Sequence, residues 1–132
     1  MSAQYKTFAT MASVPEKQNS SGPIAPDVPQ ISSTHHRADV LKSNRVVVIY
    51  YHAEWCAPCK KFAPEFNELA QKWARSGVAF VKENVDDEFD RPDDITAVPC
   101  FHFYYTGQFQ PKMTLTGVDK FAIETNLNSM RE

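Results

Sequence analysis

The sequence predicts one α/β domain in which helices pack around a central sheet. Strand-like and helix-like segments alternate from residue 31 to the end of this 132-residue chain, whose 42% apolar content suits a single core. Within the segment RVVVIYYHA, residues 45–53, positions 46–51 are continuously apolar and rich in β-branched and aromatic side chains. A strand buried on both faces has this composition. A long segment with helical periodicity follows it directly, so a strand is expected to lead into a helix.

Two helices are predicted around this first strand. Thr34 is a candidate N-cap for a short helix that ends near Asn44. The second helix is expected from about Ala57 to Arg75, with a kink at Pro64, because a proline ring removes one backbone hydrogen bond. The glycine that follows, at position 77, is expected to close the second helix.

Three further strands and a last helix complete the predicted order. VAFVKENV (78–85) and CFHFYY (100–105) are expected to be buried strands, and TGQ a turn. FQPKMTL (109–115) is expected to be an edge strand, since its proline cannot donate to a sheet ladder. The acidic stretch 86–94 is predicted to be a loop. The last helix is expected to be amphipathic, with Asp119 near its start, and its apolar positions are Phe121, Leu127 and Met130.

The N-terminal stretch, residues 1–30, is predicted to be a flexible extension, so the domain is expected over 31–132. It holds four prolines with many Ser, Ala and Gln and shows no sustained periodicity. It contains no apolar stretch of signal-peptide length, and no segment of the chain is long enough to span a membrane. We therefore expect the protein in the cytoplasm, with organellar targeting by the extension as the open alternative.

Charge and cysteine content restrict the function. A formal net charge of -2 argues against nucleic acid as a partner, because phosphate binding needs a clustered excess of Lys and Arg. The three cysteines, Cys56, Cys59 and Cys100, are an odd number and too few for a disulfide-stapled secreted fold. We expect Cys100 to be a buried core residue, with a second resolving or regulatory thiol as the alternative.

The motif HAEWCAPCKKFAP places two cysteines where a strand is predicted to lead into a helix. Cys56 then lies at the helix N-terminus, where unpaired backbone N–H groups and the helix dipole stabilise a thiolate. In such settings a cysteine pKa falls from about 8.5 towards 7 or lower. Cys59 lies one turn inward, where it can attack a disulfide formed on Cys56, and we expect it to be the more buried of the two and to keep its proton longer. Pro58 lacks only an N–H that would be unpaired in the first turn.

A zinc site is the alternative use of this cysteine pair. Structural zinc needs four ligands, and the chain has no second C-x-x-C motif. The histidines have no zinc-finger spacing, so we expect no metal site; they are His35, His36, His52 and His102. We expect the first two on the surface, His52 in packing or in solvent with a place at the active-site face as the alternative, and His102 in the core or on a face of the sheet.

Several spaced motifs resemble the thioredoxin family. WCAPCK is similar to the active-site motif of that family, which usually has Gly at the position of Ala57. VKENVD, VPCFHFYYTGQ and LTGVDK resemble the segments that follow it, in the same order. The resemblance implies a thioredoxin fold, with a mixed central sheet flanked by helices. It also implies a cis bond between Val98 and Pro99, and a substrate groove that these two residues form with Trp55 and Gly117.

Three positions depart from the pattern of the family. Tyr50 stands where thioredoxins usually have a buried Asp that helps to deprotonate the resolving thiol, so water, Lys82 or Tyr50 itself would have to take over this task. The acidic stretch is shorter than the helix-bearing segment of the family, so that helix is expected to be reduced or lost. Cys100 follows the expected cis-proline, where Thr is more frequent.

The resemblance implies a protein disulfide reductase. Cys56 would attack a disulfide in a protein substrate and Cys59 would resolve the intermediate, without a bound cofactor. We expect a monomer that an NADPH-dependent thioredoxin reductase recycles. Two alternatives stay open, namely a more oxidising disulfide exchanger and a non-enzymatic binding subunit of a larger complex.

Overall fold

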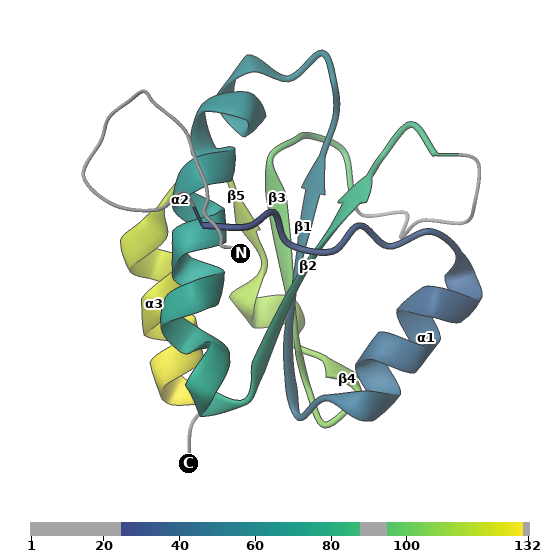
Figure 1. Ribbon diagram of the computed structural model, residues 1–132, viewed down its shortest axis with the longest axis vertical. Helices are drawn as coiled ribbons and strands as arrows, with labels where there is room; N and C mark the ends of the chain where they lie inside the picture. Colours follow the sequence, from purple (N-terminus) through teal and green to yellow (C-terminus); the bar gives the residue numbers. More distant parts are fainter. Residues whose placement is uncertain (1–24, 88–94, 131–132) are drawn as a thin grey trace, which may run out of the picture.

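The protein forms a five-stranded sheet with helices on both faces (Figure 1). The computed structural model describes residues 25–87 and 95–130. Its elements are α1 (Thr34–Ser43), β1 (Val46–His52), α2 (Ala57–Trp73), the 3₁₀ turn η2 (Ala74–Ser76), β2 (Val78–Asn84), β3 (Cys100–Tyr105), β4 (Gln108–Phe109), the 3₁₀ turn η3 (Pro111–Met113), β5 (Leu115–Thr116) and α3 (Lys120–Ser129).

The sheet is mixed, as expected. Its strand order is β2-β1-β3-β4, and β5 pairs with the other end of β3. β1 is parallel to β2 and antiparallel to β3. Figure 1 shows α1 on one side of the sheet and α2 and α3 side by side on the other. This is the predicted arrangement of helices around a sheet whose central strand, β1, is buried on both faces.

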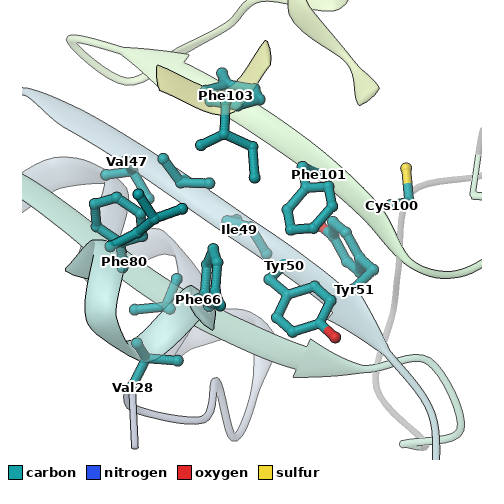
Figure 2. Close-up of a cluster of buried hydrophobic side chains, with 14 of the residues drawn as sticks. Val28, Val47, Ile49, Tyr50, Tyr51, Phe66, Phe80, Cys100, Phe101 and Phe103 are labelled. Carbon is teal, nitrogen blue, oxygen red and sulfur yellow. The ribbon is translucent and has the colours of Figure 1, made fainter. Parts of the chain in front are cut away.

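Aromatic side chains fill the space between β1 and α2. The Tyr50 ring stacks on Phe101 with centroids 4.9 Å apart, and it contacts Phe66 of α2 at 4.7 Å (Figure 2). Because side chains alternate along a strand, Tyr51 points to the opposite face, where its ring meets His102 at 5.0 Å. His102 is 1% exposed, which agrees with the expected core position.

The start of the packed domain lies before residue 31. Within residues 25–30, Val28 is buried, and Ile31 that follows is fully buried. The Ile31 N–H donates to the Lys82 carbonyl at 2.7 Å, so this segment runs along the edge of β2. The predicted flexible extension therefore includes residues that pack on the core. The rest of it, residues 1–24, lies outside the described residues.

Proline and glycine decide two element boundaries. α2 was expected to reach Arg75; it ends at Trp73 and continues as η2, after which Gly77 takes the left-handed conformation with φ 77°. The closure by glycine is confirmed. The predicted edge strand 109–115 is wrong, because Pro111 begins a 3₁₀ turn that separates two two-residue strands, β4 and β5.

The last helix is less amphipathic than predicted. Asp119 is its N-cap and accepts from the Ala122 N–H at 3.0 Å, and Leu127 is buried. Phe121 was expected on the apolar face, but 80% of its surface is exposed, and Ile123 lies in the core instead. Between β2 and β3 the described residues contain no helix, and the loop predicted over 86–94 lies largely outside them.

The N-cap of α1 is Ser33, not the predicted Thr34. The Ser33 hydroxyl accepts from the His36 N–H at 3.0 Å and so satisfies one of the unpaired donors of the first turn. We predict that Ser33→Ala lowers the free energy of unfolding by about 1 kcal/mol. Thr34→Ala should change it by less than about 0.5 kcal/mol, because Thr34 is exposed. Urea unfolding measures both, and equal losses would contradict this assignment.

Candidate active site

The two cysteines of the motif lie at the junction of β1 and α2. Cys56 is the N-cap of α2, and its sulfur accepts from the Cys59 N–H at 3.2 Å. The two residues form a disulfide. Ala57 and Pro58 lie exposed in the first turn between them. The sulfur of Cys56 therefore occupies the helix N-terminus, as predicted, where backbone N–H groups and the dipole favour a thiolate after reduction.

Burial does not distinguish the two cysteines. The sequence suggested that Cys59 is the more buried one, but Cys56 is 4% and Cys59 3% exposed. Their surroundings differ instead: Cys59 lines a cavity of about 150 Å³ on the sheet side of the helix terminus, together with Tyr50 and Lys82. Any difference in acidity must then come from the cap position of Cys56 and from the groups around that cavity.

The Val98–Pro99 bond is cis, as the resemblance implied. Cys100 pairs with Tyr51 in the antiparallel register of β1 and β3, so Pro99 lies beside the end of β1 that leads to the cysteines. The Pro99 carbonyl accepts from the Gly117 N–H at 2.9 Å, and Gly117 has φ 93°. Segments far apart in sequence thus meet at this edge of the sheet.

Trp55 lies on the solvent side of the disulfide. Its indole is 68% exposed, and its Nε1–H donates to the Asp86 carboxylate at 2.9 Å. Trp55 and Val98 line a shallow pocket of about 130 Å³ between the active-site loop and the segment before Pro99. Exposed aromatic surface beside a groove is typical of a site that binds another protein.

Tyr50 occupies the position where the family usually has a carboxylate. Its ring is buried, and its hydroxyl donates to the Cys59 carbonyl at 2.9 Å. Burial raises the pKa of Tyr50 to about 12. The phenol therefore keeps its proton at neutral pH and cannot act as a base. This excludes Tyr50 from the three groups expected to replace the carboxylate of the family, which are water, Lys82 and Tyr50.

His52 also lines the cavity beside Cys59, a position that the sequence left between packing and solvent. Its Nε2 lies 3.2 Å from the Gln30 Oε1. Burial and the neighbouring Lys82 ammonium lower the pKa of His52, against the opposing effects of Glu54 and Asp87. At neutral pH this imidazole is therefore uncharged.

The remaining candidates do not line the cavity beside Cys59. Cys100 is a buried thiol in β3 and pairs with Tyr51, so its side chain is on the face of the sheet opposite to Tyr50. This agrees with a core residue. His35 is exposed on α1. Over residues 25–87 and 95–130, no group of three or more His, Cys, Asp or Glu side chains could hold a metal ion.

Sequence reasoning missed two contacts of the site. Gln30 was assigned to the flexible extension, although a hydrogen bond joins it to His52 across 22 positions. Asp86 was placed in a solvated acidic loop, although it holds Trp55. A local pattern contains no signal for the contact of Gln30. For Asp86, its position directly after a buried strand, at the edge where the cysteine motif also lies, was the available hint.

A disulfide at the N-terminus of a helix, beside a cis-proline on a mixed sheet, defines a thiol-disulfide oxidoreductase. The family model described as Thioredoxin matches residues 27–129. The chain belongs to the thioredoxin family.

Within the part of the chain that the structure describes, no helix is long and apolar enough to cross a membrane.

Individual relatives agree with this assignment. The chain is 32% identical to thioredoxin of Ovis aries over 107 residues, which cover 78% of this chain and 98% of the relative. It is 40% identical to thioredoxin of Ictalurus punctatus over 67 residues, 49% of this chain and 63% of that one. The oxidised mitochondrial thioredoxin 3 of Saccharomyces cerevisiae matches with a TM-score of 0.67 and 28% identity, covering 77% and 94% of the two chains.

Proposed function

We propose that the protein is a protein disulfide reductase in which Cys56 is the nucleophile and Cys59 the resolving thiol. The observation that carries the proposal is the placement of Cys56 as the N-cap of α2, where its thiolate is stabilised. The thiolate attacks one sulfur of a substrate disulfide, which releases a substrate thiol and leaves a mixed disulfide on Cys56. Cys59 then attacks Cys56, which forms the intramolecular disulfide and releases the second substrate thiol.

The groove beside the disulfide supports a protein substrate. An extended peptide can lie between Trp55 and the loop of Gly117 and bind the Val98 backbone as an added strand. Trp55, Pro99 and Ala57 would shape this site, and the exposed indole would supply apolar contact area. The pair is reduced again by a dithiol donor, for which we propose an NADPH-dependent thioredoxin reductase. A monomeric state and a cytoplasmic location stay predictions, and the yeast relative is mitochondrial by name.

Insulin disulfide reduction with dithiothreitol as the electron donor tests the proposal. The wild-type protein should accelerate insulin precipitation, and Cys100→Ser should do so equally, because the Cys100 side chain lies on the face of the sheet opposite to Tyr50. The reduction potential of the Cys56–Cys59 pair, measured by equilibration with redox buffers, should lie near the thioredoxin value of about -270 mV. A folded protein without activity would contradict the proposal, and a potential near about -120 mV would instead indicate an oxidising exchanger.

A further inference from the structure

The resolving step of the proposed function needs a base near Cys59. A thiol attacks a disulfide only as the thiolate, so the Cys59 proton has to leave before the mixed disulfide on Cys56 is resolved. Tyr50 donates to the Cys59 carbonyl and keeps its own proton. Tyr50, which contacts Cys59 from β1, therefore cannot accept this proton.

The cavity of about 150 Å³ beside Cys59 offers a route for that proton. Five of its lining side chains carry polar or ionisable groups besides Cys59, and the volume accommodates several water molecules. These five are Tyr50, His52, Glu54, Lys60 and Lys82. The base must be one of them or the solvent itself.

Two of these groups can accept a proton, His52 and Glu54, and only His52 is held partly away from bulk water. Lys60 and Lys82 present ammonium groups, which are donors without an acceptor site. Glu54 is exposed, so its carboxylate is hydrated and faces bulk water. His52 is half-buried and neutral, and an imidazole near its pKa is an efficient proton acceptor.

The N-terminal segment contacts the His52 ring. The Gln30 Oε1 lies 3.2 Å from the His52 Nε2, and a neutral imidazole that donates to this oxygen from Nε2 has its lone pair on Nδ1. The backbone of Gln30 is held in place because it forms a β-bridge with Lys82, and the Lys82 N–H donates to the Pro29 carbonyl at 3.0 Å. The segment before α1 therefore places the Gln30 side chain beside the imidazole.

We propose that His52 receives the Cys59 proton through water in the cavity that both side chains line. In this step Cys59–SH becomes the thiolate and His52 becomes the imidazolium. The thiolate attacks the Cys56 sulfur, the bond between Cys56 and the substrate sulfur breaks, and the Cys56–Cys59 disulfide forms. The departing substrate thiolate takes up one proton, which returns His52 to its neutral state, so the step needs no further oxidant or reductant.

The charges around His52 set the sign of the pH dependence. Burial and Lys82 of β2 disfavour the imidazolium, whereas Glu54 and Asp87 favour it, and the net effect lowers the pKa of His52 below about 6.5. Lys60 also faces the cavity, and Tyr50 is neutral. The resolving step should therefore slow as the pH falls through the pKa of His52, where the base becomes protonated.

Single-turnover rapid mixing separates the two steps. Excess reduced protein reacts with 5,5′-dithiobis(2-nitrobenzoate) at protein concentrations where attack by Cys56 is the faster step, and each step releases one coloured thiolate. Cys59→Ser should give the first release only, which assigns the second one. His52→Gln should leave the first release within about twofold and slow the second about tenfold or more at pH 7. The inflection of the second rate at the pKa of His52 should disappear, which leaves the steady decrease with falling pH that deprotonation of the thiol by solvent gives.

Two variants complete the test. His35→Gln removes an exposed histidine of α1 and should change neither release. A second release that is unchanged in His52→Gln, or slower but with the wild-type pH profile, would overturn the role of His52. An equal loss in Glu54→Gln would assign the proton to that carboxylate and would overturn it too. If wild type shows no first release, the proposed function fails first, and the role of His52 falls with it.

Discussion

Cys59→Ser should stop turnover and leave the substrate covalently attached to Cys56. The serine hydroxyl cannot displace a sulfur from a disulfide, whereas Cys56 keeps its cap position and the backbone N–H groups that stabilise its thiolate. We expect insulin reduction to fall by roughly a thousandfold or more, the scale that follows loss of a reacting group. Mass spectrometry under non-reducing conditions should show the protein with one insulin chain attached, and dithiothreitol should release it.

Cys56→Ser provides the matched control. It should be as inactive as Cys59→Ser but should form no adduct, because Cys59 is placed behind the cap position and faces the cavity rather than the groove. The difference between the two variants distinguishes the nucleophile from the resolving thiol. An adduct on Cys59 in the Cys56→Ser protein, with none on Cys56 in the Cys59→Ser protein, would reverse the two roles.

Glu83→Leu should cause the largest loss of stability among single charge changes in the described structure. The Glu83 carboxylate is 1% exposed and accepts two hydrogen bonds from Arg37 of α1, at 2.8 and 3.1 Å. Without it, a guanidinium that is only 14% exposed is left without this carboxylate partner. Removing one partner of a buried pair costs about 3–5 kcal/mol, which urea unfolding should show as a lower free energy of unfolding.

An exposed ion pair serves as the comparison. Lys72 and Glu124 join α2 to α3, but Lys72 is 65% exposed, so Lys72→Met should cost less than about 1 kcal/mol. The double variant Arg37→Met with Glu83→Leu should recover most of the loss, because no buried charge is left. If Glu83→Leu costs no more than Lys72→Met, the buried pair does not stabilise α1 on the sheet.

This pair also bears on the active site. Glu83 follows Lys82, which lines the cavity, and precedes the turn in which Asp86 holds Trp55. The end of β2 thus connects the residue that pairs with α1 to one that lines the cavity and one that holds Trp55. We expect Glu83→Leu to reduce activity only in proportion to the fraction of unfolded protein. The pH profile of the resolving step should stay that of the wild type, which distinguishes this variant from His52→Gln.

Local signals were sufficient for the elements that build the sheet. β1, β2 and β3 were predicted within two residues, because each is a buried run of β-branched and aromatic residues between turn signals. The closure of α2 at Gly77 and the cap of α3 at Asp119 follow from the backbone preferences of those two residue types.

Two elements were predicted wrongly. Phe121 lies six residues before Leu127, which places it on another face of the helix, and its ring is exposed. Ile123 and Met130 lie four residues before and three after Leu127, and all three are buried, so the apolar spacing contained this face and the prediction missed it. Pro111 was predicted to lie within one edge strand, whereas β3 pairs with two separate short strands, one before and one after this proline.

Local sequence was enough to predict the redox chemistry: two cysteines one turn apart, at the start of a helix that follows a buried strand, are placed for disulfide exchange by backbone geometry alone. Tertiary structure decided what surrounds them. Gln30, His52 and Lys82 lie far apart along the chain and meet only because residues before α1 run along β2, which is parallel to β1. Such contacts depend on strand register and packing, which no local pattern contains, so the proton path that we propose became visible only in the folded protein.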